Sequence, residues 1–446
     1  MKKGLFKLNL LLACCIMVCA LAACGKKRSA NTVIFWHTMG DKLENILIEV
    51  IDDFNEEYPD IKIKQESIGG YTDLRDQIVT KITAGDQPNL AYCYPDHVAL
   101  YRKANAVLPL DSFINDDEIG FSQAEIDNFV SQFYLEGATF GDNKMYTLPF
   151  LKSTELLYYN ETFFTQHDLA LPTTWDELWT LCEQIKKIDP NSIPIGIDSE
   201  SNLFITLAEQ QGNGYTSFDP ETKKGKFDFN NDENKAFVTE LKENYDKGYF
   251  TTEELYGSYT SGLFTNTEPN EDGKVIRSYM VIGSSGGATY QATSAFNVGI
   301  TMIPQEDVTN PKAISQGPSL CLFDFNKSVN EKAWTFMKYL LRDEVQIKFA
   351  IASGYMPVTH SAQQNQYYVE DYLNLADGTA AGISALAAKQ AIKQVELDAY
   401  FVSPAFVGSS TARDEVGNII ILVMEGQKTV AKAFKEALEE CEYNVG

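Results

Sequence analysis

Residues 33–64 read VIFWHTMGDKLENILIEVIDDFNEEYPDIKIK, an apolar run, a helical pattern and a second short run. Apolar side chains recur at every third or fourth position from Leu43 to Phe54, which is the spacing of one buried helix face. Pro59 ends the helix, and residues 61–64 alternate between isoleucine and lysine as a strand does. This order of strand, helix and strand predicts a parallel βαβ unit.

The same alternation continues along the chain. Apolar residues spaced by four from Leu74 to Ile82 predict a second helix, and the turn GDQP at 85–88 leads into an apolar strand over 90–94. Residues 33–94 therefore predict an α/β lobe with a largely parallel sheet.

Later segments carry signals for single elements. The sequence GDNK at 141–144 lies between two apolar runs and predicts a hairpin. Residues 155–159 predict a strand, and Asn160 can cap the helix that follows. Thr174 and Glu177 have the spacing of a capping box.

The N-terminus carries an export signal. Lysines precede an apolar stretch over 8–20 that is too short to span a bilayer. The run LAAC at 21–24 resembles a bacterial lipobox, in which residues 1–23 are removed as a signal peptide and Cys24 receives lipid, palmitate included. The alternative is an ordinary signal that leaves Cys24 as a plain thiol. We expect an extracytoplasmic protein, lipid-anchored to the cell membrane through a tether over 24–31.

The acidic composition limits the partners of the chain. It has 37 Lys and Arg against 62 Asp and Glu, a formal net charge of −25. Such a surface disfavours nucleic acid and anionic lipid, so we expect the membrane to be met through the lipid anchor only. Removing 23 of the 446 residues leaves 423, a length that suits two lobes.

Metal and cofactor chemistry has no support in the sequence. Cys93, Cys182, Cys321 and Cys441 follow the signal at wide spacing and without a CxxC pair, so zinc-ligand spacing is absent. We expect each to pack as a small apolar residue, with their pairing left open. The four histidines have no metal-binding spacing, and no GxxxxGK[ST] motif is present for ATP. We expect no metal and no cofactor.

One pattern matches a catalytic motif. Residues 283–287, GSSGG, satisfy G-x-S-x-G after a strand-like run, as a nucleophile elbow would. With Ser285 as nucleophile, Asp324 or Asp343 and then His360 would complete a serine hydrolase. The sequence lacks an oxyanion loop of the HGGG type, so we expect the chain not to be an enzyme.

Loops beyond the predicted strands favour binding instead. They carry Trp36, His37 and Thr38 after the first strand, Tyr71 after two glycines, and Asp96 after the third strand. In open α/β sheets, ligands bind at such loops. Aromatic faces beside short polar groups suit a polyol, because ring faces stack while hydroxyls form directional hydrogen bonds. The sequence leaves open that these aromatics only fill the sheet edge.

Ten short segments follow one another in a distinctive order. They are FWHTMGD (35–41), FNEEYPDI (54–61), AGD (84–86), LPF (148–150), ST (153–154), YYN (158–160), TWDE (174–177), SSG (284–286), GP (317–318) and GYMPV (354–358). Their order and spacing resemble the extracellular solute-binding proteins of ABC importers, a group that includes maltodextrin- and glycerol-3-phosphate-binding proteins.

The resemblance implies an α/β, two-lobe periplasmic-binding-protein-like fold of class II type, with the ligand cleft between the lobes. Lobe I would comprise 32–148 and 301–341, and lobe II 149–300 and 342–446. It further implies a monomer that closes on its ligand and docks on the transmembrane subunits of an ABC permease.

Agreement is closest with the glycerol-3-phosphate-binding branch, which implies a set of ligand contacts. These are the aromatic ring of Tyr71, the hydroxyls of Ser153 and of Ser284 or Ser285, the backbone of Gly317, the phenol of Tyr355 and a phosphate-facing guanidinium at Arg413. With the loop residues named above, they form the expected site.

The chain departs from that branch at two contacts. The acidic contact of the branch falls at Pro95, with Asp96 adjacent, and its stacking tryptophan falls near 201–204, where no tryptophan stands. The departures favour a carbohydrate, a sugar or oligosaccharide, over glycerol-3-phosphate or a glycerophosphodiester. Arg413 is left open between facing a phosphate and pairing with a carboxylate such as Asp414. The competing classes are a secreted hydrolase that uses Ser285 and a surface-attachment protein that does not close.

Overall fold

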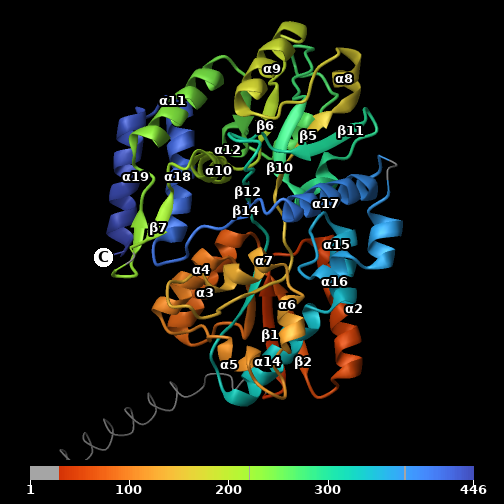
Figure 1. The fold of residues 1–446 in the computed structure, drawn as a ribbon, viewed down its shortest axis with the longest axis vertical. Coiled ribbons are helices and arrows are strands. Elements are labelled where there is room, and N and C mark those ends of the chain that lie inside the picture. The colour runs from red at the N-terminus through yellow and green to blue at the C-terminus, as the bar shows by residue number, and fades with distance from the viewer. Residues whose placement is uncertain (1–29, 220, 376–377, 446) are drawn as a thin grey trace, which may run out of the picture.

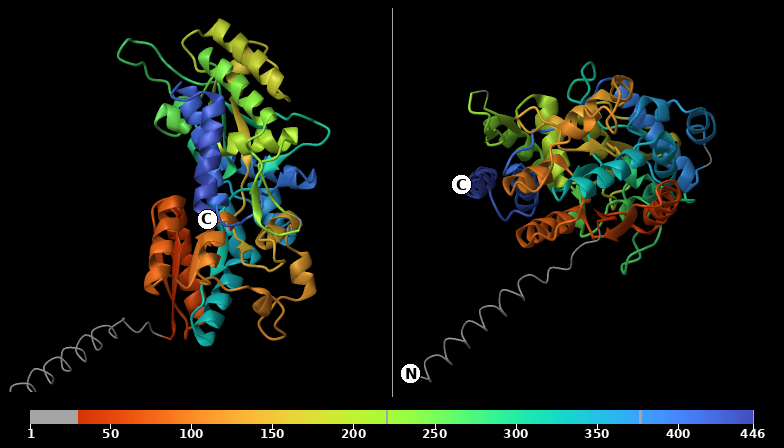
Figure 2. Two further views of the ribbon diagram at one scale, coloured as in Figure 1. Left: turned by 90° about the vertical axis from the view of Figure 1, so that its left-hand side faces the viewer. Right: turned by 90° about the horizontal axis from the view of Figure 1, so that it is seen from below.

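The structure, a computed structural model, describes residues 30–219, 221–375 and 378–445. The expected signal peptide, Cys24 and most of the expected tether lie outside the described residues. Two sheets lie one above the other, each with its own helices, and the molecule is elongated along the line that joins them (Figures 1 and 2).

The first sheet has the strand order β2-β1-β3-β13-β4. Strand β1 (Thr32–His37) pairs in parallel with β2 (Lys62–Ser67) and β3 (Leu90–Cys93), which confirms the predicted parallel unit. Strand β13 (Ser319–Leu322) comes from far along the chain and runs antiparallel to β3 and to β4 (Leu148–Pro149).

Helices on both faces complete this half of the molecule. They are α2 (Asp41–Glu57), α3 (Tyr71–Ala84), α4 (Pro95–Lys103), α5 (Asp111–Ile114), α6 (Gln123–Asp127), α7 (Ser131–Leu135), η1 (Glu136–Ala138), α14 (Lys327–Leu340), α15 (Asp343–Ala352), α16 (His360–Gln363) and η3 (Tyr367–Tyr372). The predicted apolar face of α2 is confirmed, since Leu47, Val50 and Phe54 are fully buried.

We expected the chain to return to lobe II at residue 342, but helix α15 belongs to lobe I. It packs against α2, and its Val345 and Phe349 belong to the core around the first sheet. The division of the chain into lobes remains a proposal, with α15, α16 and η3 moved to lobe I and residues 301–314 moved to lobe II.

The second sheet has the order β11-β5-β10-β6-β9. The predicted strand β5 (Glu155–Asn160) runs antiparallel to β10 (Met280–Ser284) and β11 (Val298–Met302). Strand β10 is parallel to β6 (Ile195–Ile197), and β6 to β9 (Phe250–Thr252). The carboxyl ends of β10, β6 and β9 therefore share one edge with the amino end of β5. This edge faces the first lobe (Figure 1).

The second half holds the remaining helices and two small ladders. The helices are α8 (Glu161–Gln166), α9 (Trp175–Ile188), α10 (Glu200–Gln211), α11 (Asp232–Asp246), α12 (Glu253–Tyr256), α13 (Ser261–Phe264), η2 (Ser285–Gln291), α17 (Ala380–Glu396), α18 (Ser409–Met424) and α19 (Val430–Val445). The ladders are β7 (Thr216–Phe218) with β8 (Gly225–Phe227), and β12 (Ala313–Ile314) with β14 (Tyr400–Phe401).

The two predicted helix caps are confirmed. The Asn160 side chain accepts a hydrogen bond of 2.9 Å from the Phe163 N–H at the start of α8. Thr174 accepts one of 3.3 Å from the Glu177 N–H, and the Glu177 carboxylate accepts from the Thr174 N–H in return.

The predicted hairpin about residues 141–144 is wrong. The turn is present, but the flanking residues form no ladder, and the Tyr146 N–H donates only to the Gly137 carbonyl at 2.9 Å. Arg102 of α4 supplies further contacts to this segment. Its guanidinium donates to the Phe140 carbonyl at 3.5 Å and lies 4.0 Å from the centre of the Tyr146 ring.

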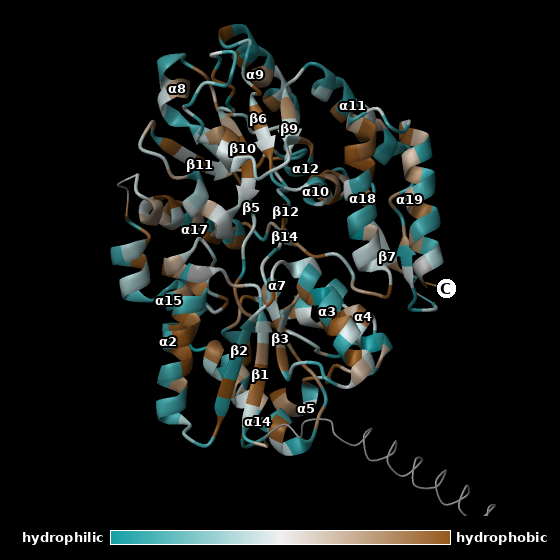
Figure 3. Cartoon of the chain, turned by 180° about the vertical axis from the view of Figure 1, so that it is seen from behind, coloured by the Kyte–Doolittle hydropathy of each residue, from teal (hydrophilic) through white to brown (hydrophobic). Residues whose placement is uncertain are grey.

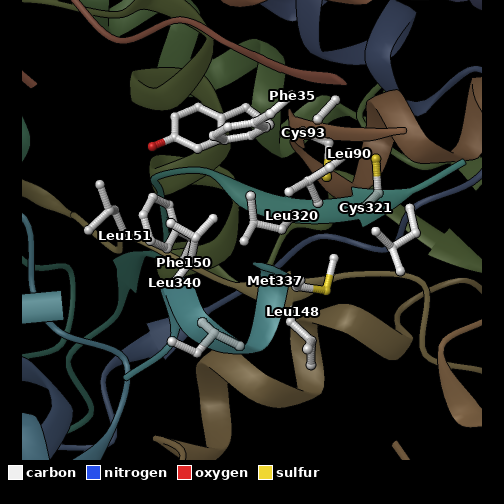
Figure 4. Packing of buried hydrophobic residues seen from close by; sticks show 14 of the residues in the cluster. Phe35, Leu90, Cys93, Leu148, Phe150, Leu151, Leu320, Cys321, Met337 and Leu340 are labelled. Carbon is white, nitrogen blue, oxygen red and sulfur yellow. The ribbon is translucent and has the colours of Figure 1, made fainter. Parts of the chain in front are cut away.

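Apolar residues concentrate inside each half and polar residues outside it (Figure 3). Figure 4 shows part of the first core, where Cys93 and Cys321 of adjacent strands lie near Leu320 and Met337. Cys93, Cys182, Cys321 and Cys441 are all buried and unpaired, as expected of small apolar residues. Across the described ranges, every helix is too short or too polar to cross a bilayer.

Between the sheets, three pieces of chain lie side by side, which we call the crossing ribbon (residues 152–153, 316–317 and 356). Ser153 and Gln316 exchange two backbone hydrogen bonds of 2.9 Å each. Lys152 exchanges two more with Met356, of 2.7 and 3.3 Å. The ribbon thus ties together segments that are far apart in sequence.

Two features hold the ribbon tightly. Gly317 has φ of +90°, and a Cβ there would lie 2.1 Å from the Leu151 carbonyl oxygen, so a side chain has no room. The fully buried Lys152 ammonium forms an ion pair with Glu136 and donates to the Gly317 carbonyl at 3.3 Å. A buried charge requires such partners.

Candidate ligand cleft

A cavity of about 740 Å³ lies between the facing edges of the two sheets. This volume is typical of small-molecule sites. The lining comes from loops after β1, β2 and β3, from the facing edge of the second sheet, from the crossing ribbon and from the start of α18.

Seven of the eleven predicted ligand-binding residues line this cavity. They are Thr38, Tyr71, Asp96, Ser153, Ser284, Tyr355 and Arg413. The first three lie at the carboxyl ends of first-sheet strands, as expected for loops of an open α/β sheet. The fold therefore gathers residues that span more than 370 positions of the chain.

Trp36 and His37 do not reach the cavity. Both belong to β1 itself and are buried, and Thr38 is the first residue beyond the strand. The His37 ring bonds to the Gln65 side chain at 2.7 Å and accepts from the Met39 N–H at 3.1 Å. Burial lowers the pKa of His37, which keeps the ring neutral. Gly317 also lies behind the lining, within the crossing ribbon.

Ser285 is fully buried and is bonded to backbone. Its N–H donates to the Thr154 carbonyl at 2.8 Å, and its hydroxyl accepts from the Thr154 N–H at 3.3 Å. His360, its proposed catalytic partner, is exposed at the start of α16, and Asp343 accepts instead from Thr359 at 2.8 Å. The serine packs β10 against β5 and does not form a nucleophile site.

The lobe I wall of the cavity is aromatic. The rings of Tyr71 and Tyr94 lie 4.8 Å apart between centroids, and the Tyr71 hydroxyl has Thr38 and Tyr355 as side-chain partners. Burial raises the pKa of Tyr71, Tyr94 and Tyr355, so these phenols are neutral hydrogen-bonding groups. Burial also lowers the pKa of the neighbouring His97, which leaves that ring uncharged.

Both guanidiniums in the lining are already bonded to protein. Arg75 forms ion pairs with Asp76 at 2.8 Å and Asp414 at 3.2 Å. Arg413 donates to the side-chain oxygen of Asn202. Asp414 thus pairs with Arg75, and Arg413 keeps its contact with the cavity.

Three carboxylates lie along the facing edge of the second sheet: Glu155 at the start of β5, Asp198 after β6 and Glu253 after β9. Burial raises the pKa of Glu155 to about 7, against a hydrogen bond from Asn202. Burial, with Asp198, Glu200 and Glu254 adding repulsion, raises the pKa of Glu253 to about 7. Burial raises the pKa of Asp198 as well, although the Thr260 N–H and hydroxyl donate to it at 2.8 and 2.7 Å.

Sequence reasoning missed these three carboxylates. Strands β6 and β9 have only three residues each, too few for an alternating pattern. The sequence signal for Asp198 and Glu253 was their position, because each stands directly after a short apolar or β-branched run. In the described part of the chain, no cluster of three or more His, Cys, Asp and Glu side chains is arranged to hold a metal ion.

Comparison with known proteins gives a family match. The chain matches the family described as bacterial extracellular solute-binding protein over residues 49–376. It is 26% identical over 357 residues to the sn-glycerol-3-phosphate-binding periplasmic protein UgpB of Shigella flexneri serotype 5b, covering 77% of each chain. The counterpart from Escherichia coli K12 is 25% identical with the same coverage.

Solved structures share the fold at low identity. The substrate-binding protein Lmo0181 of Listeria monocytogenes, in complex with cycloalternan, has a TM-score of 0.74 at 18% identity, covering 93% of this chain and 99% of that one. UgpB of Mycobacterium tuberculosis, in complex with glycerophosphocholine, has a TM-score of 0.73 at 16% identity, with coverage of 93% and 98%. These likenesses confirm the expected two-lobe α/β fold.

Proposed function

We propose that this chain, which belongs to the bacterial extracellular solute-binding proteins, captures a carbohydrate between its lobes and delivers it to the permease of an ABC importer. Members of the family bind substrates and are not enzymes. The choice of ligand rests on the lining of the cavity. Neutral phenols and carboxylates are far more numerous there than positively charged groups that are not already bonded to protein.

The lining offers both kinds of contact that a sugar needs. Tyr259 and Tyr290 are 65% and 74% exposed and line the cavity, so their ring faces are available for stacking. Ser153 and Asn202 are hydrogen-bonding groups for hydroxyls, and carboxylates such as Asp96 accept from them. Rotation of the lobes toward each other would enclose a ligand between these walls.

The balance of charge disfavours a phosphate ligand. Five carboxyl groups line the cavity, and its two guanidiniums are bonded to Asp414 and Asn202. A phosphate would lie in the field of these carboxylates and would compete for arginines that already have partners.

A glycerol phosphate or glycerophosphodiester is the second candidate. Arg413 lines the cavity, and its planar guanidinium can bind two phosphate oxygens at once. Curated relatives at 25–26% identity are named for sn-glycerol-3-phosphate binding.

We also propose that the protein acts as a monomer held at the membrane by lipid on Cys24. The LAAC run at 21–24 supports the anchor. The anchor would keep the binding protein near its permease without contributing to ligand contacts.

A thermal-shift screen tests the function, because a ligand that binds only the folded state raises its apparent stability. The panel contains mono- and oligosaccharides, glycerol-3-phosphate and glycerophosphocholine. We expect a carbohydrate to raise Tm, and Tyr290→Ala to reduce that shift. A rise with the phosphates alone would contradict the carbohydrate proposal and favour the second candidate.

A further inference from the structure

The lobe II edge of the cavity concentrates negative charge. Asp198 and Glu253 line it, and Glu200 and Glu254 lie close behind. The charges that act on Asp198 and Glu253 are those of other carboxylates: Glu200 for the first, and Asp198, Glu200 and Glu254 for the second. Glu155, at the start of β5, differs because Asn202 connects it to Arg413. Within the described ranges, neither Asp198 nor Glu253 is connected to a cation in this way.

A buried acceptor beside these acids has no partner. Gln291 of η2 is 2% exposed and lines the cavity, and in the described chain its Oε1 accepts no hydrogen bond. A Cβ built on Gly283 would lie 3.5 Å from the Gln291 Nε2 and 2.7 Å from an oxygen of Asp198, so amide and carboxylate flank the same gap. A buried acceptor without a partner is destabilising. Turning the side-chain amide would exchange Nε2 for Oε1 beside Asp198, where a donor on a ligand could bond to both oxygens.

Two exposed aromatic rings complete the surroundings. Tyr290 belongs to the same turn as Gln291, and Tyr259 adjoins Thr260, which donates to Asp198. Glu253, Asp198 and Tyr290 all act on the hydroxyl of Tyr259, which places that ring beside the acids. Carboxylates, an unpaired oxygen and tyrosine faces attract a cation that donates hydrogen bonds.

We propose that this acceptor edge (Asp198, Glu253, Gln291, Tyr259 and Tyr290) binds a primary ammonium group, R–NH3+, carried by the ligand. The inference rests on the proposed function, since it takes this cavity as the solute site. A sugar hydroxyl could donate to Gln291, but it would leave the negative charge of Asp198 and Glu253 uncompensated. A primary ammonium group both donates to Gln291 and supplies the positive charge.

A primary ammonium group can come from an amino sugar or from an ethanolamine-type headgroup, and paired probes separate the two sources. Glucosamine is compared with glucose, and ethanolamine with its neutral isostere propan-1-ol, by calorimetry at low salt and about neutral pH. We expect the charged member of at least one pair to bind about tenfold more tightly than the neutral member. The pair that responds identifies the source.

Variants assign the preference to the edge. Asp198→Asn keeps the acceptor for Thr260, and Glu253→Gln changes a half-buried side chain, so both should fold. We expect each to reduce the preference for the charged probe severalfold. Glu254→Gln is the matched control, because Glu254 is the next residue of α12 but is exposed and outside the lining. It should leave the preference unchanged.

The outcomes separate this inference from the proposed function. Equal binding of charged and neutral probes by the wild type, or no binding of either at tens of millimolar, overturns the ammonium site. If Glu254→Gln and Glu253→Gln reduce the preference for the charged probe equally, the proposal is also overturned. The preference would then arise from long-range attraction by the net charge. Carbohydrate binding without any preference for charge would leave the proposed function intact. Ethanolamine binding without carbohydrate binding would overturn that function and keep the ammonium site.

Discussion

Arg75 of α3 and Asp414 of α18 lie 3.2 Å apart at the rim of the cavity, so that an ion pair connects the two lobes. Helix α3 follows β2 of the first sheet, whereas α18 packs on α10 of the second lobe and reaches α4. The left view of Figure 2 shows the blue C-terminal helices extending down to the orange helices of the first lobe. The pair is made in this arrangement of the lobes and would lengthen if they moved apart.

Arg75→Ala should therefore shift the ligand-free protein toward a more open arrangement. The change should be small, about 1 kcal/mol or less, because the Asp414 carboxylate is 55% exposed and screened by water. Small-angle scattering without ligand should show a larger radius of gyration than in the wild type. Lys81→Ala is the control, since the Lys81–Asp86 pair of 3.1 Å lies within lobe I. An identical radius for all three proteins would show that the pair does not hold the lobes.

Arg413→Ala distinguishes the two ligand classes. A carbohydrate should bind this variant within about tenfold of the wild type, because its hydroxyls have many other partners. A phosphate ligand should lose about 2–5 kcal/mol, the range for truncating a buried charged contact. Calorimetry of both proteins with both ligand classes decides between them. Tight phosphate binding that disappears in the variant would contradict the carbohydrate proposal.

Glu155 should make the protein less stable as the pH rises from about 4.5 to 7. Its pKa is about 7 in the folded protein against 4.5 normally, so the folded state holds a proton that the unfolded state has lost in this window. The free energy of unfolding then falls with pH, by at most about 3 kcal/mol, and levels off above the folded pKa. Glu155→Gln keeps the acceptor for Asn202 but should lose this part of the slope.

Urea unfolding at several pH values, compared between wild type and variant, measures the difference. Glu49→Gln on the exposed face of α2 should keep the wild-type slope. If the free energy of unfolding depends on pH in the same way for Glu155→Gln and the wild type, Glu155 ionises normally in the folded protein.

Gly317→Ala should destabilise the crossing ribbon through a clash. Its Cβ would approach the Leu151 carbonyl oxygen to 2.1 Å, in addition to the strain of a positive φ. Gly85→Ala is the matched control, since Gly85 also has a positive φ, +67°, but no atom within 4 Å of the added Cβ. In urea unfolding, we expect Gly317→Ala to lower the free energy of unfolding by more than about 1 kcal/mol beyond the decrease caused by Gly85→Ala. Equal losses would mean that the ribbon shifts to accommodate the methyl group.

Cys24→Ala tests the anchor. If Cys24 carries the lipid, the variant should appear in the medium or remain unprocessed, whereas Cys182→Ala should stay with the membrane. Fractionation of the expressing cells and mass spectrometry of the N-terminus measure this. Normal membrane retention of Cys24→Ala would contradict the lipobox interpretation.

The parts of the fold that the sequence predicted are those set by nearby residues. The α2 face and the Asn160 cap depend on side chains within one element, so their spacing is visible in the chain. By contrast, β13 joins β3 after more than 220 intervening residues, and no local pattern records that pairing.

The residues of the site could be predicted only where the end of the preceding strand could be predicted. Thr38 lines the cavity and His37 does not, although the two are neighbours, because a strand ends between them. An error of one position at a strand end thus changes which side chain reaches the ligand. Asp198 and Glu253 were missed for the same reason, since their strands were too short to predict.

The crossing ribbon limits how the two lobes can move. Sliding one lobe past the other would break the four backbone hydrogen bonds that connect Lys152 to Met356 and Ser153 to Gln316. Rotation about the axis of the ribbon keeps these four bonds and changes backbone dihedral angles at its ends, together with rim contacts such as Arg75–Asp414. The ribbon therefore favours rotation of the lobes over sliding, so that the carboxylates of lobe II approach the tyrosines of lobe I along an arc about the ribbon.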